Sequence, residues 1–242
     1  MNVSSGNIAK AINIFDLQYR KSGIRAQRMY PNEALIQFMA RNYNSVADES
    51  RKEIKVLEVG CGSGANLWML AKEGFDAYGL DGSNTAVEIA NAHLKEKWGV
   101  TAKLSFGDFT ELPYEDRFFD AVVDVVSLQH LDVISMKKSL FEIGRILKPN
   151  GKFFSYRLGD HSIMYLQERN KRIDPVTVEN IDRTDLPLHN NGPTSFWSPS
   201  LANVIYSECG LKIDDVEVYT RVNSNGMKVE YLAISASHEI KA

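Results

Sequence analysis

A glycine-rich loop and two later aspartates are the parts of the sequence best suited to chemistry. The apolar run at residues 54–59 leads directly into residues 60–64 (GCGSG), and a helical pattern begins after them. Glycines at such a turn let the backbone approach a ligand, and free amides at the start of a helix attract polar or anionic groups. Asp81 follows the next apolar run, and Asp108 follows the one after it. Because ligands bind at the carboxyl ends of parallel strands, these residues together predict a nucleotide-like ligand.

Two kinds of nucleotide fit this loop. Residues 60–65 match the dinucleotide fingerprint G-x-G-x-x-A, and Asp81 follows at about the 20 residues expected of an acid that binds ribose. A nicotinamide-dependent oxidoreductase is therefore one interpretation. Glu58 before the loop and the Gly107-Asp108 pair favour a different nucleoside, with the Asp108 carboxylate accepting a hydrogen bond from an adenine amino group.

The order of several further segments resembles that of class I S-adenosylmethionine-dependent methyltransferases. The resemblance covers residues 54–158 and rests on VLEVGCGSG at 56–64, GLDGS at 79–83, GDF at 107–109 with LP at 112–113, FFDAVV at 118–123 and LKPNG at 147–151. These segments lie at the spacings typical of that family. The resemblance implies S-adenosyl-L-methionine as the cofactor and S-adenosyl-L-homocysteine as the product.

The resemblance also implies roles for individual residues. Glu58 would organise the loop and face the amino end of the methionine, Asp81 would hold both ribose hydroxyls, and Asp108 would contact the adenine amino group. Gly82 stands where many relatives have a bulky apolar residue that stacks on adenine, so stacking is expected from elsewhere, with Phe109 as the candidate. The other expected cofactor contacts are Arg28, Gly60, Cys61, Gly62, Gly64, Asn66, Gly82, Ser83 and Val125. For Cys61, a small side chain in a tight loop is a simpler interpretation than a catalytic thiol.

His130 is the candidate catalytic side chain. It lies in residues 127–131 (SLQHL), directly after the fourth expected strand, where the methyl group should emerge. Its ordinary pKa of about 6.5 suits a general base or a group that orients the acceptor. The alternative is an imidazole that only bonds the backbone and shapes the pocket wall.

The segment before the first strand offers further candidates. Tyr19 and Tyr30 could cap the methyl site, and Arg28 could pair with the methionine carboxylate, if the leading helices close over the cofactor. The alternative is an amphipathic covering helix with solvated arginines.

Residues 159–196 form a long connection between the fifth expected strand and the following helix. Connections of this length at strand ends often bind substrate. Basic and aromatic side chains in and beside it suggest recognition of phosphate or carboxylate, and we expect substrate contacts from Arg157, His161, Arg169, Arg172 and Trp197. A solvated charged face is the alternative. The segment could form a lid, a dimer contact or both, so a homodimer is one option.

The acceptor is predicted to be a small polar molecule. The basic side chains suggest an anionic acceptor, and the predicted reaction is O-methylation of a sugar, a sugar nucleotide or a phosphorylated compound. YPNE at residues 30–33 is similar to methyltransferases of bacterial surface-polysaccharide synthesis. N-methylation of a small amine is the alternative reaction. A non-catalytic subunit that uses the fold to bind a partner is the alternative function, although an intact loop with both acids argues against a degenerate site.

The elements that position these residues are expected to form an α/β fold. Short apolar runs alternate with helical patterns, which predicts a parallel sheet covered by helices. The expected strands are residues 54–59, 77–80, 102–106, 119–126 and 152–156, followed by 212–219 and 229–235. The Asn225-Gly226 turn makes the last two strands an antiparallel hairpin. The predicted fold is a Rossmann-like three-layer sandwich with a seven-stranded, mostly parallel sheet.

The chain is expected to fold as a single domain, residues 1–242, because no linker, repeat or low-complexity tract divides it. Its expected parts are an N-terminal helical cover at 1–50, a cofactor-binding core at 51–158, a substrate-binding or cap insertion at 159–196, and a C-terminal helix and hairpin at 197–242. Within the cover, the spacing of Leu35, Phe38 and Met39 predicts an amphipathic helix after Pro31.

Composition and charge exclude several other classes of protein. The 242 residues are 44% hydrophobic and 24% charged, as in ordinary soluble globular proteins. The formal net charge of −3 lacks the basic excess needed to bind nucleic acid through its phosphates. The longest apolar stretch, 121–128, is too short to span a membrane, and Cys61 and Cys209 match no metal or redox spacing. We therefore expect a cytoplasmic protein with a small-molecule acceptor, no metal, and no nucleic-acid or membrane partner.

Overall fold

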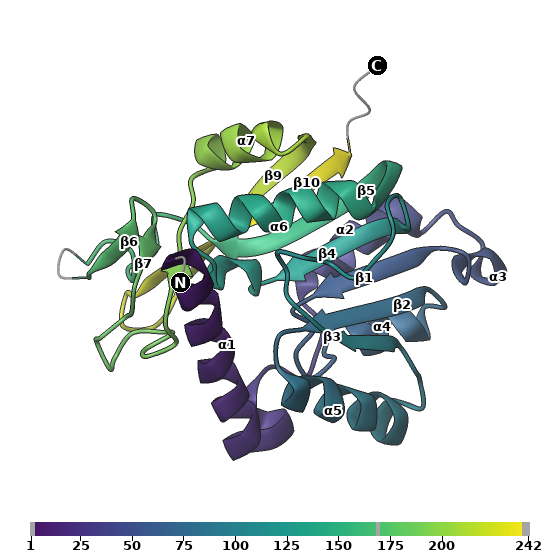
Figure 1. Ribbon diagram of the computed structural model, residues 1–242, viewed down its shortest axis with the longest axis horizontal. Coiled ribbons are helices and arrows are strands. Elements are labelled where there is room, and N and C mark those ends of the chain that lie inside the picture. The colour runs from purple at the N-terminus through teal and green to yellow at the C-terminus, as the bar shows by residue number, and fades with distance from the viewer. Residues whose placement is uncertain (1–2, 168–169, 239–242) are drawn as a thin grey trace.

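The computed structural model describes residues 3–167 and 170–238, and its centre is a seven-stranded sheet (Figure 1). The strand order is β3-β2-β1-β4-β5-β10-β9. These strands are β1 (Lys55–Val59), β2 (Asp76–Asp81), β3 (Lys103–Phe106), β4 (Phe119–Val125), β5 (Leu147–Leu158), β9 (Leu211–Val222) and β10 (Lys228–His238). Strands β1 to β5 pair in parallel, and β10 runs antiparallel to both β5 and β9. The predicted fold class, including the terminal hairpin, is confirmed.

Helices cover both faces of the sheet, because neighbouring side chains on a strand point to opposite faces. Phe153 on β5 packs in one apolar cluster with side chains of α6 (Val133–Ile146) and α7 (Pro199–Glu208). Phe154 packs in a second cluster with α2 (Glu33–Tyr43) and α4 (Leu67–Lys72). The result is the three-layer arrangement that the alternating sequence pattern predicts.

The remaining helices of the core lie at the β2–β3 side of the sheet and before β1. Helix α5 (Asn84–His93) follows β2 and continues into a π-helical turn at Leu94–Trp98, and the short helix α3 (Asp48–Arg51) precedes β1. The Ser83 hydroxyl accepts a hydrogen bond from the Ala86 amide and so caps α5. This cap fixes where the chain turns after β2, next to Asp81.

Replacing Phe153 by alanine is expected to lower the free energy of unfolding by about 3–5 kcal/mol. The ring is fully buried and stacks on Tyr206 at a centroid distance of 5.7 Å, so its removal leaves a cavity. Urea denaturation measures the loss. Phe141→Ala is the control, because that ring is 54% exposed on α6, and it should cost less than about 1 kcal/mol. Equal losses in the two variants would contradict this view of the core.

The N-terminal cover contains one long helix that the sequence analysis predicted and another that it did not. The helix after Pro31 is α2, and Leu35, Phe38 and Met39 on it are buried as predicted. The unpredicted helix is α1 (Val3–Ser22), followed by a short 3-10 turn at Gly23–Ala26. Figure 1 shows α1 crossing in front of the carboxyl ends of the parallel strands, where a ligand would bind.

The long connection after β5 forms a small substructure of its own. It contains a three-stranded sheet of β6 (Arg172–Asp174), β7 (Thr177–Val178) and β8 (Thr194–Ser195). Its apolar cluster includes Met164, Val178 and Phe196. The Asn191 side chain accepts a hydrogen bond from Gln18 at 2.9 Å, so this substructure contacts α1 directly.

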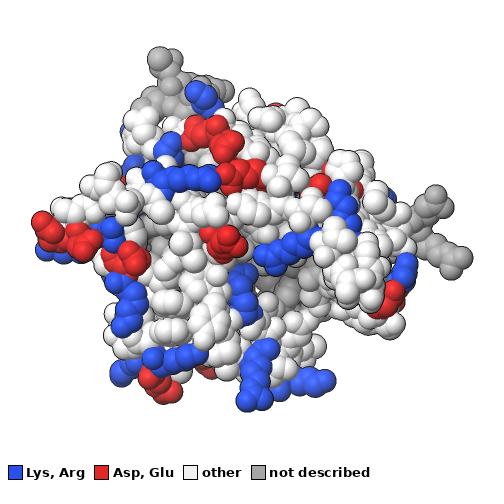
Figure 2. Space-filling view, turned by 180° about the vertical axis from the view of Figure 1, so that it is seen from behind, with Lys and Arg blue, Asp and Glu red and all other residues white. Residues whose placement is uncertain are grey.

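The surface carries charges of both signs. On the face seen in Figure 2, basic and acidic side chains are interspersed rather than gathered into one basic area. In the part of the chain that the structure describes, no helix combines the length and the apolarity needed to cross a bilayer.

Candidate active site

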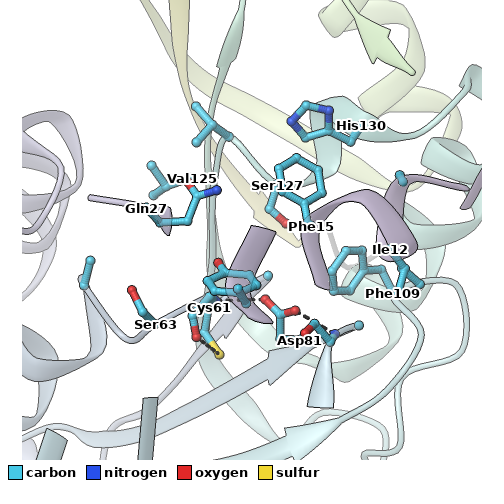
Figure 3. A pocket seen from close by; sticks show the side chains of 18 of the residues that line it. Ile12, Phe15, Gln27, Cys61, Ser63, Asp81, Phe109, Val125, Ser127 and His130 are labelled. Carbon is cyan, nitrogen blue, oxygen red and sulfur yellow. Dashed lines mark hydrogen bonds between the residues drawn. The ribbon is translucent and has the colours of Figure 1, made fainter. Parts of the chain in front are cut away.

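A cavity lies at the carboxyl ends of β1, β2 and β4 (Figure 3). It is lined by α1, by the glycine loop, by the turn after β2 and by the segment after β4. In Figure 3, Asp81 and His130 lie at opposite ends of the group of side chains, with Phe15 of α1 between them. The cavity brings together many of the residues predicted from the sequence, namely Tyr19, Arg28, Gly60, Cys61, Gly62, Asp81, Gly82, Ser83, Phe109, Val125 and His130.

The glycine loop is shaped by its close approach to neighbouring segments. Gly60 and Gly62 have φ values of +69° and +52°, which side chains rarely adopt. A Cβ atom on Gly60 would collide with the Ser127 side chain, and one on Gly62 would lie 2.5 Å from the Tyr19 hydroxyl oxygen. Gly64 instead faces Ala90 of α5 and Leu94 of the following π-helical turn, and it does not line the cavity. The loop therefore leaves its backbone exposed to a ligand between β4 and α1.

Asp81 is held in place by two backbone amides. Its carboxylate accepts hydrogen bonds from the amides of Gly62 and Ser83, each at 2.8 Å. Burial raises the pKa of Asp81, and these two hydrogen bonds act in the opposite direction by stabilising the charged form. A carboxylate has more acceptor positions than these two bonds use. The Asp81 oxygens can therefore accept further bonds from a vicinal diol such as ribose.

Glu58 and Arg28 carry buried polar atoms without hydrogen-bond partners among the described residues. One Glu58 oxygen accepts a bond from the Asn66 side chain at 2.5 Å, and the other has no partner. The Nε atom of Arg28 also has none. Arg28 lines the cavity, whereas Glu58 and Asn66 lie outside its lining. The unpaired donor of Arg28 lies at the cavity and suits a ligand that carries a carboxylate, whereas Glu58 acts on the loop through its bond to Asn66.

The raised pKa of Glu58 predicts that the stability of the protein without a ligand depends on pH. Burial raises the pKa of Glu58 to about 8, well above its value in an unfolded chain. Between those values the folded state binds a proton that the unfolded state releases. The free energy of unfolding should therefore fall as the pH rises from about 5 to 8, by at most ~1.4 kcal/mol per pH unit.

The measurement is urea denaturation of the wild type and of Glu58→Gln at several pH values. The glutamine cannot ionise, so the difference between the two proteins isolates the contribution of Glu58. A difference that stays constant from pH 5 to 8 would contradict the raised pKa.

His130 is a buried, neutral imidazole in the short 3-10 turn Leu128–His130 after β4. Its Nδ1 atom lies 2.9 Å from the Pro193 carbonyl oxygen, which can only accept, so Nδ1 carries the hydrogen and Nε2 is the acceptor. The side-chain nitrogen of Gln129 lies 3.4 Å from Nε2, and the Phe15 ring packs edge-on at a centroid distance of 4.7 Å. Burial lowers the pKa of His130 to about 4. The imidazole is therefore uncharged at neutral pH.

Asp124 holds the turn that carries His130. Its carboxylate accepts bonds from the amides of Ser127 and Leu128, each at 3.0 Å, and from the Ser155 hydroxyl at 2.7 Å. Val126, in the same segment, has a φ of +59°, a strained value for a β-branched residue. The strain lies in the wall of the cavity, which Val126 lines.

Two of the expected contacts lie away from this cavity because local bonds direct them elsewhere. Asp108 is exposed, and its carboxylate accepts bonds from the amide and the hydroxyl of Thr110. Tyr30 is 64% exposed and packs edge-on against Trp98. Neither residue lines the cavity, so the adenine contact expected of Asp108 and the methyl-site role of Tyr30 are not placed there.

The residues expected to bind substrate do not line the cavity either. Arg157 is fully buried, lies over the Trp197 ring at 3.6 Å and donates to the Ser195 hydroxyl at 2.8 Å. Trp197 is buried with it. His161 contacts the carboxylates of Asp160 and Glu230, and Arg172 lies over the Tyr165 ring. Arg169 lies outside the described residues. Packing within the insertion and against β5 therefore explains these side chains better than a shared binding site does.

The main residues that sequence reasoning missed belong to α1. Ile8, Ala11, Ile12 and Phe15 line the cavity together with Tyr19. Their spacing of three and four residues is the signal of one helix face, and it was present in the sequence. The long helix before Pro31 was overlooked, so its apolar face was overlooked with it.

Comparison with known proteins agrees with the geometry of the loop. Residues 56–151 match a family model described as a methyltransferase domain. A SAM-dependent methyltransferase from Methanosarcina mazei shares the fold, with a TM-score of 0.64 and 21% identity over 77% of this chain and 93% of that chain. The chain therefore carries a segment similar to a methyltransferase domain and has the fold of S-adenosylmethionine-dependent methyltransferases. The glycine loop lies within the matched residues, which favours S-adenosylmethionine over a nicotinamide as its ligand.

Other proteins similar to this chain have diverse names. Sterol 24-C-methyltransferases of Debaryomyces hansenii and Candida albicans are 34% and 33% identical over 140 residues, or 56% of this chain. The chain spans about a third of their length, since the match covers 36% of each. A 1,6-didemethyltoxoflavin-N1-methyltransferase of Burkholderia thailandensis has a TM-score of 0.68 and 15% identity, covering 99% of this chain and 92% of that one.

The residues of the cavity fit the cofactor S-adenosylmethionine. The fixed carboxylate of Asp81 suits the ribose hydroxyls, and the unpaired donor of Arg28 suits the carboxylate of the methionine part. Burial raises the pKa of the Cys61 thiol, which keeps it protonated and favours the interpretation that Cys61 is a small residue in a tight loop.

Proposed function

We propose that the chain transfers the methyl group of S-adenosylmethionine to a small-molecule acceptor bound at the His130 end of the cavity. The observation that carries this proposal is the position of two side chains in one cavity. Asp81, held by two amides, lies at one end, and the neutral imidazole of His130 lies at the other. A ribose at Asp81 would leave the space near His130 for the methyl group and the acceptor.

Methyl transfer mainly requires the protein to align the acceptor atom with the methyl group. When bound, S-adenosylmethionine supplies a methyl group already activated on a sulfonium. The chain's part is to hold the acceptor atom in line and to exclude water. An O–H or N–H group of the acceptor could replace the long contact of 3.4 Å between the Gln129 side-chain nitrogen and Nε2 of His130, and the new hydrogen bond would aim the heteroatom. Nε2 of His130 would also take up the proton that the acceptor loses.

The walls near His130 favour an acceptor without phosphate. Ile8, Phe15, Val126 and Leu131 are apolar, and Arg28 is the single arginine or lysine among the described residues that line the cavity. The sterol methyltransferases are named for a sterol acceptor, which agrees better with apolar walls than a sugar phosphate does. We propose an uncharged acceptor, methylated on oxygen or, as the alternative, on nitrogen. The surface-glycan role expected from the sequence has no further support.

The test is an assay with S-adenosylmethionine labelled in its methyl group. The protein is incubated with uncharged hydroxylated and aminated small molecules and with phosphorylated counterparts of the same compounds. Label should pass to uncharged members of the set, and Asp81→Ala should prevent the transfer. Transfer to phosphorylated members alone would contradict the proposed acceptor, and failure of the wild type to bind S-adenosylhomocysteine would contradict the proposed function.

A further inference from the structure

The cavity wall beside Asp81 is formed by a residue from a distant part of the chain. Gly82 follows Asp81 and has no side chain, although its φ lies outside the left-handed region and its backbone could accommodate one. A Cβ atom on Gly82 would lie 2.9 Å from Cγ1 and 3.0 Å from Cδ1 of Ile12. Ile12 on α1 therefore occupies the space that a side chain at position 82 would fill.

Ile12 is also exposed to the cavity at this point. Both Ile12 and Gly82 line it, together with Phe109. In Figure 3, Ile12 and Phe109 are labelled on the same side of Asp81. Both side chains add apolar surface to the cavity lining.

A base attached to a ribose at Asp81 needs such a surface. Hydrogen bonds from the ribose hydroxyls to Asp81 would fix the sugar. The adenine ring is bonded directly to the ribose, so it would lie close to Asp81 as well. A flat ring is stabilised by burying its face against apolar groups, at roughly 25 cal/mol for each Å² removed from water. Gly82 offers no such face, so Ile12 supplies it in place of a side chain at position 82, with Phe109 as a second apolar group of the lining.

The geometry points to Ile12 as an adenine-contact residue, so that α1 supplies one wall of the nucleoside site. This inference rests on the proposed position of the ribose at Asp81. Helix α1 would then contact the cofactor, although it lies outside the matched segment 56–151.

A hydrogen bond holds the Ile12 region of α1 against the turn after β2. The Ser83 hydroxyl donates to the Asp16 carboxylate at 2.7 Å, one helical turn after Ile12. Ser83 follows Gly82 directly, so the turn after β2 and the Ile12 region of α1 are bonded to each other. Gln18, two residues further, is bonded to Asn191 at 2.9 Å, which adds support from the insertion.

The test is an exchange of the two side chains, followed by calorimetric titration with S-adenosylhomocysteine. Ile12→Ala should weaken binding about tenfold, because it removes apolar surface that the adenine buries. Gly82→Leu should weaken it more, since the new side chain collides with Ile12. The double variant Ile12→Ala/Gly82→Leu should recover to within about threefold of the wild type, because the leucine takes the space of the isoleucine.

The control is Leu17→Ala, which changes a residue of the same helix that is 64% exposed and does not line the cavity. It should bind like the wild type. Titration with 5′-methylthioadenosine, which has the adenosine but not the amino-acid group, should reproduce the loss in Ile12→Ala. Wild-type affinity in Ile12→Ala, or a double variant no better than Gly82→Leu, would overturn the inference. Failure of the wild type to bind S-adenosylhomocysteine would instead overturn the proposed function.

Discussion

Replacement of Asp81 by alanine is expected to weaken binding of S-adenosylhomocysteine by about 10²-fold or more. Each hydrogen bond between a ligand and a charged group contributes roughly 1.5–3 kcal/mol, and the carboxylate is positioned to accept two from a ribose. The change also frees the amides of Gly62 and Ser83, which Asp81 holds at 2.8 Å. Calorimetric titration measures the loss, and the thermal midpoint of unfolding shows that the variant is folded.

Two companion variants sharpen this result. Asp81→Asn keeps one acceptor oxygen but loses the charge, so an intermediate loss of about tenfold is expected. Asp76→Ala changes an aspartate at the opposite end of β2, whose carboxylate is bonded to Lys103. It should leave affinity unchanged. A folded Asp81→Ala protein that binds within about threefold of the wild type would show that Asp81 does not contact the cofactor.

Replacement of His130 by alanine is expected to lower turnover by about 10²-fold while the affinity for S-adenosylhomocysteine changes little. The imidazole accepts at Nε2 because Pro193 holds Nδ1, and it lies at the far end of the cavity from Asp81. Turnover is measured with the acceptor that the labelling assay identifies. Unchanged turnover would show that His130 only shapes the wall, as the simpler interpretation of the sequence holds.

The pH dependence of turnover distinguishes a buried histidine with a lowered pKa from a solvent-exposed one. Burial lowers the pKa of His130 to about 4, so the neutral form that can accept a bond is fully present above about pH 5. Protonation of His130 should therefore not reduce the rate between pH 6 and 8. His130→Gln keeps a hydrogen-bond acceptor but is no base. High activity in that variant would assign His130 to orientation, and low activity would assign it to proton transfer.

The sheet could be predicted from the sequence because each strand is specified locally. The apolar runs before residues 60–64 and before Asp81 mark their own strands, and the Asn225-Gly226 turn marks the hairpin. Strand β5 is longer than predicted, since it begins at Leu147, before the turn that contains Pro149. Boundaries of this kind depend on pairing with β4, which a local pattern does not contain.

The positions of single side chains were harder to predict, because contacts between distant segments decide them. Arg157 is drawn into the interior by the Trp197 ring and by Ser195, residues about 40 positions away. Because Arg157 is charged and lies near the predicted active site, the sequence indicated an exposed side chain that binds substrate. No residue close to it in the sequence indicated that the Trp197 ring would cover it. Asp108 was predicted from its place after β3, but the neighbouring Thr110 holds its carboxylate in a local turn.

A crystal structure of the protein with S-adenosylhomocysteine tests most directly whether the cofactor binds between Asp81 and His130. We expect both ribose hydroxyls within hydrogen-bond distance of the Asp81 carboxylate, and the sulfur atom directed toward the His130 end of the cavity. We also expect the amino-acid part near Arg28 and the glycine loop. A nucleoside bound elsewhere, or a sulfur atom facing away from His130, would contradict this binding mode.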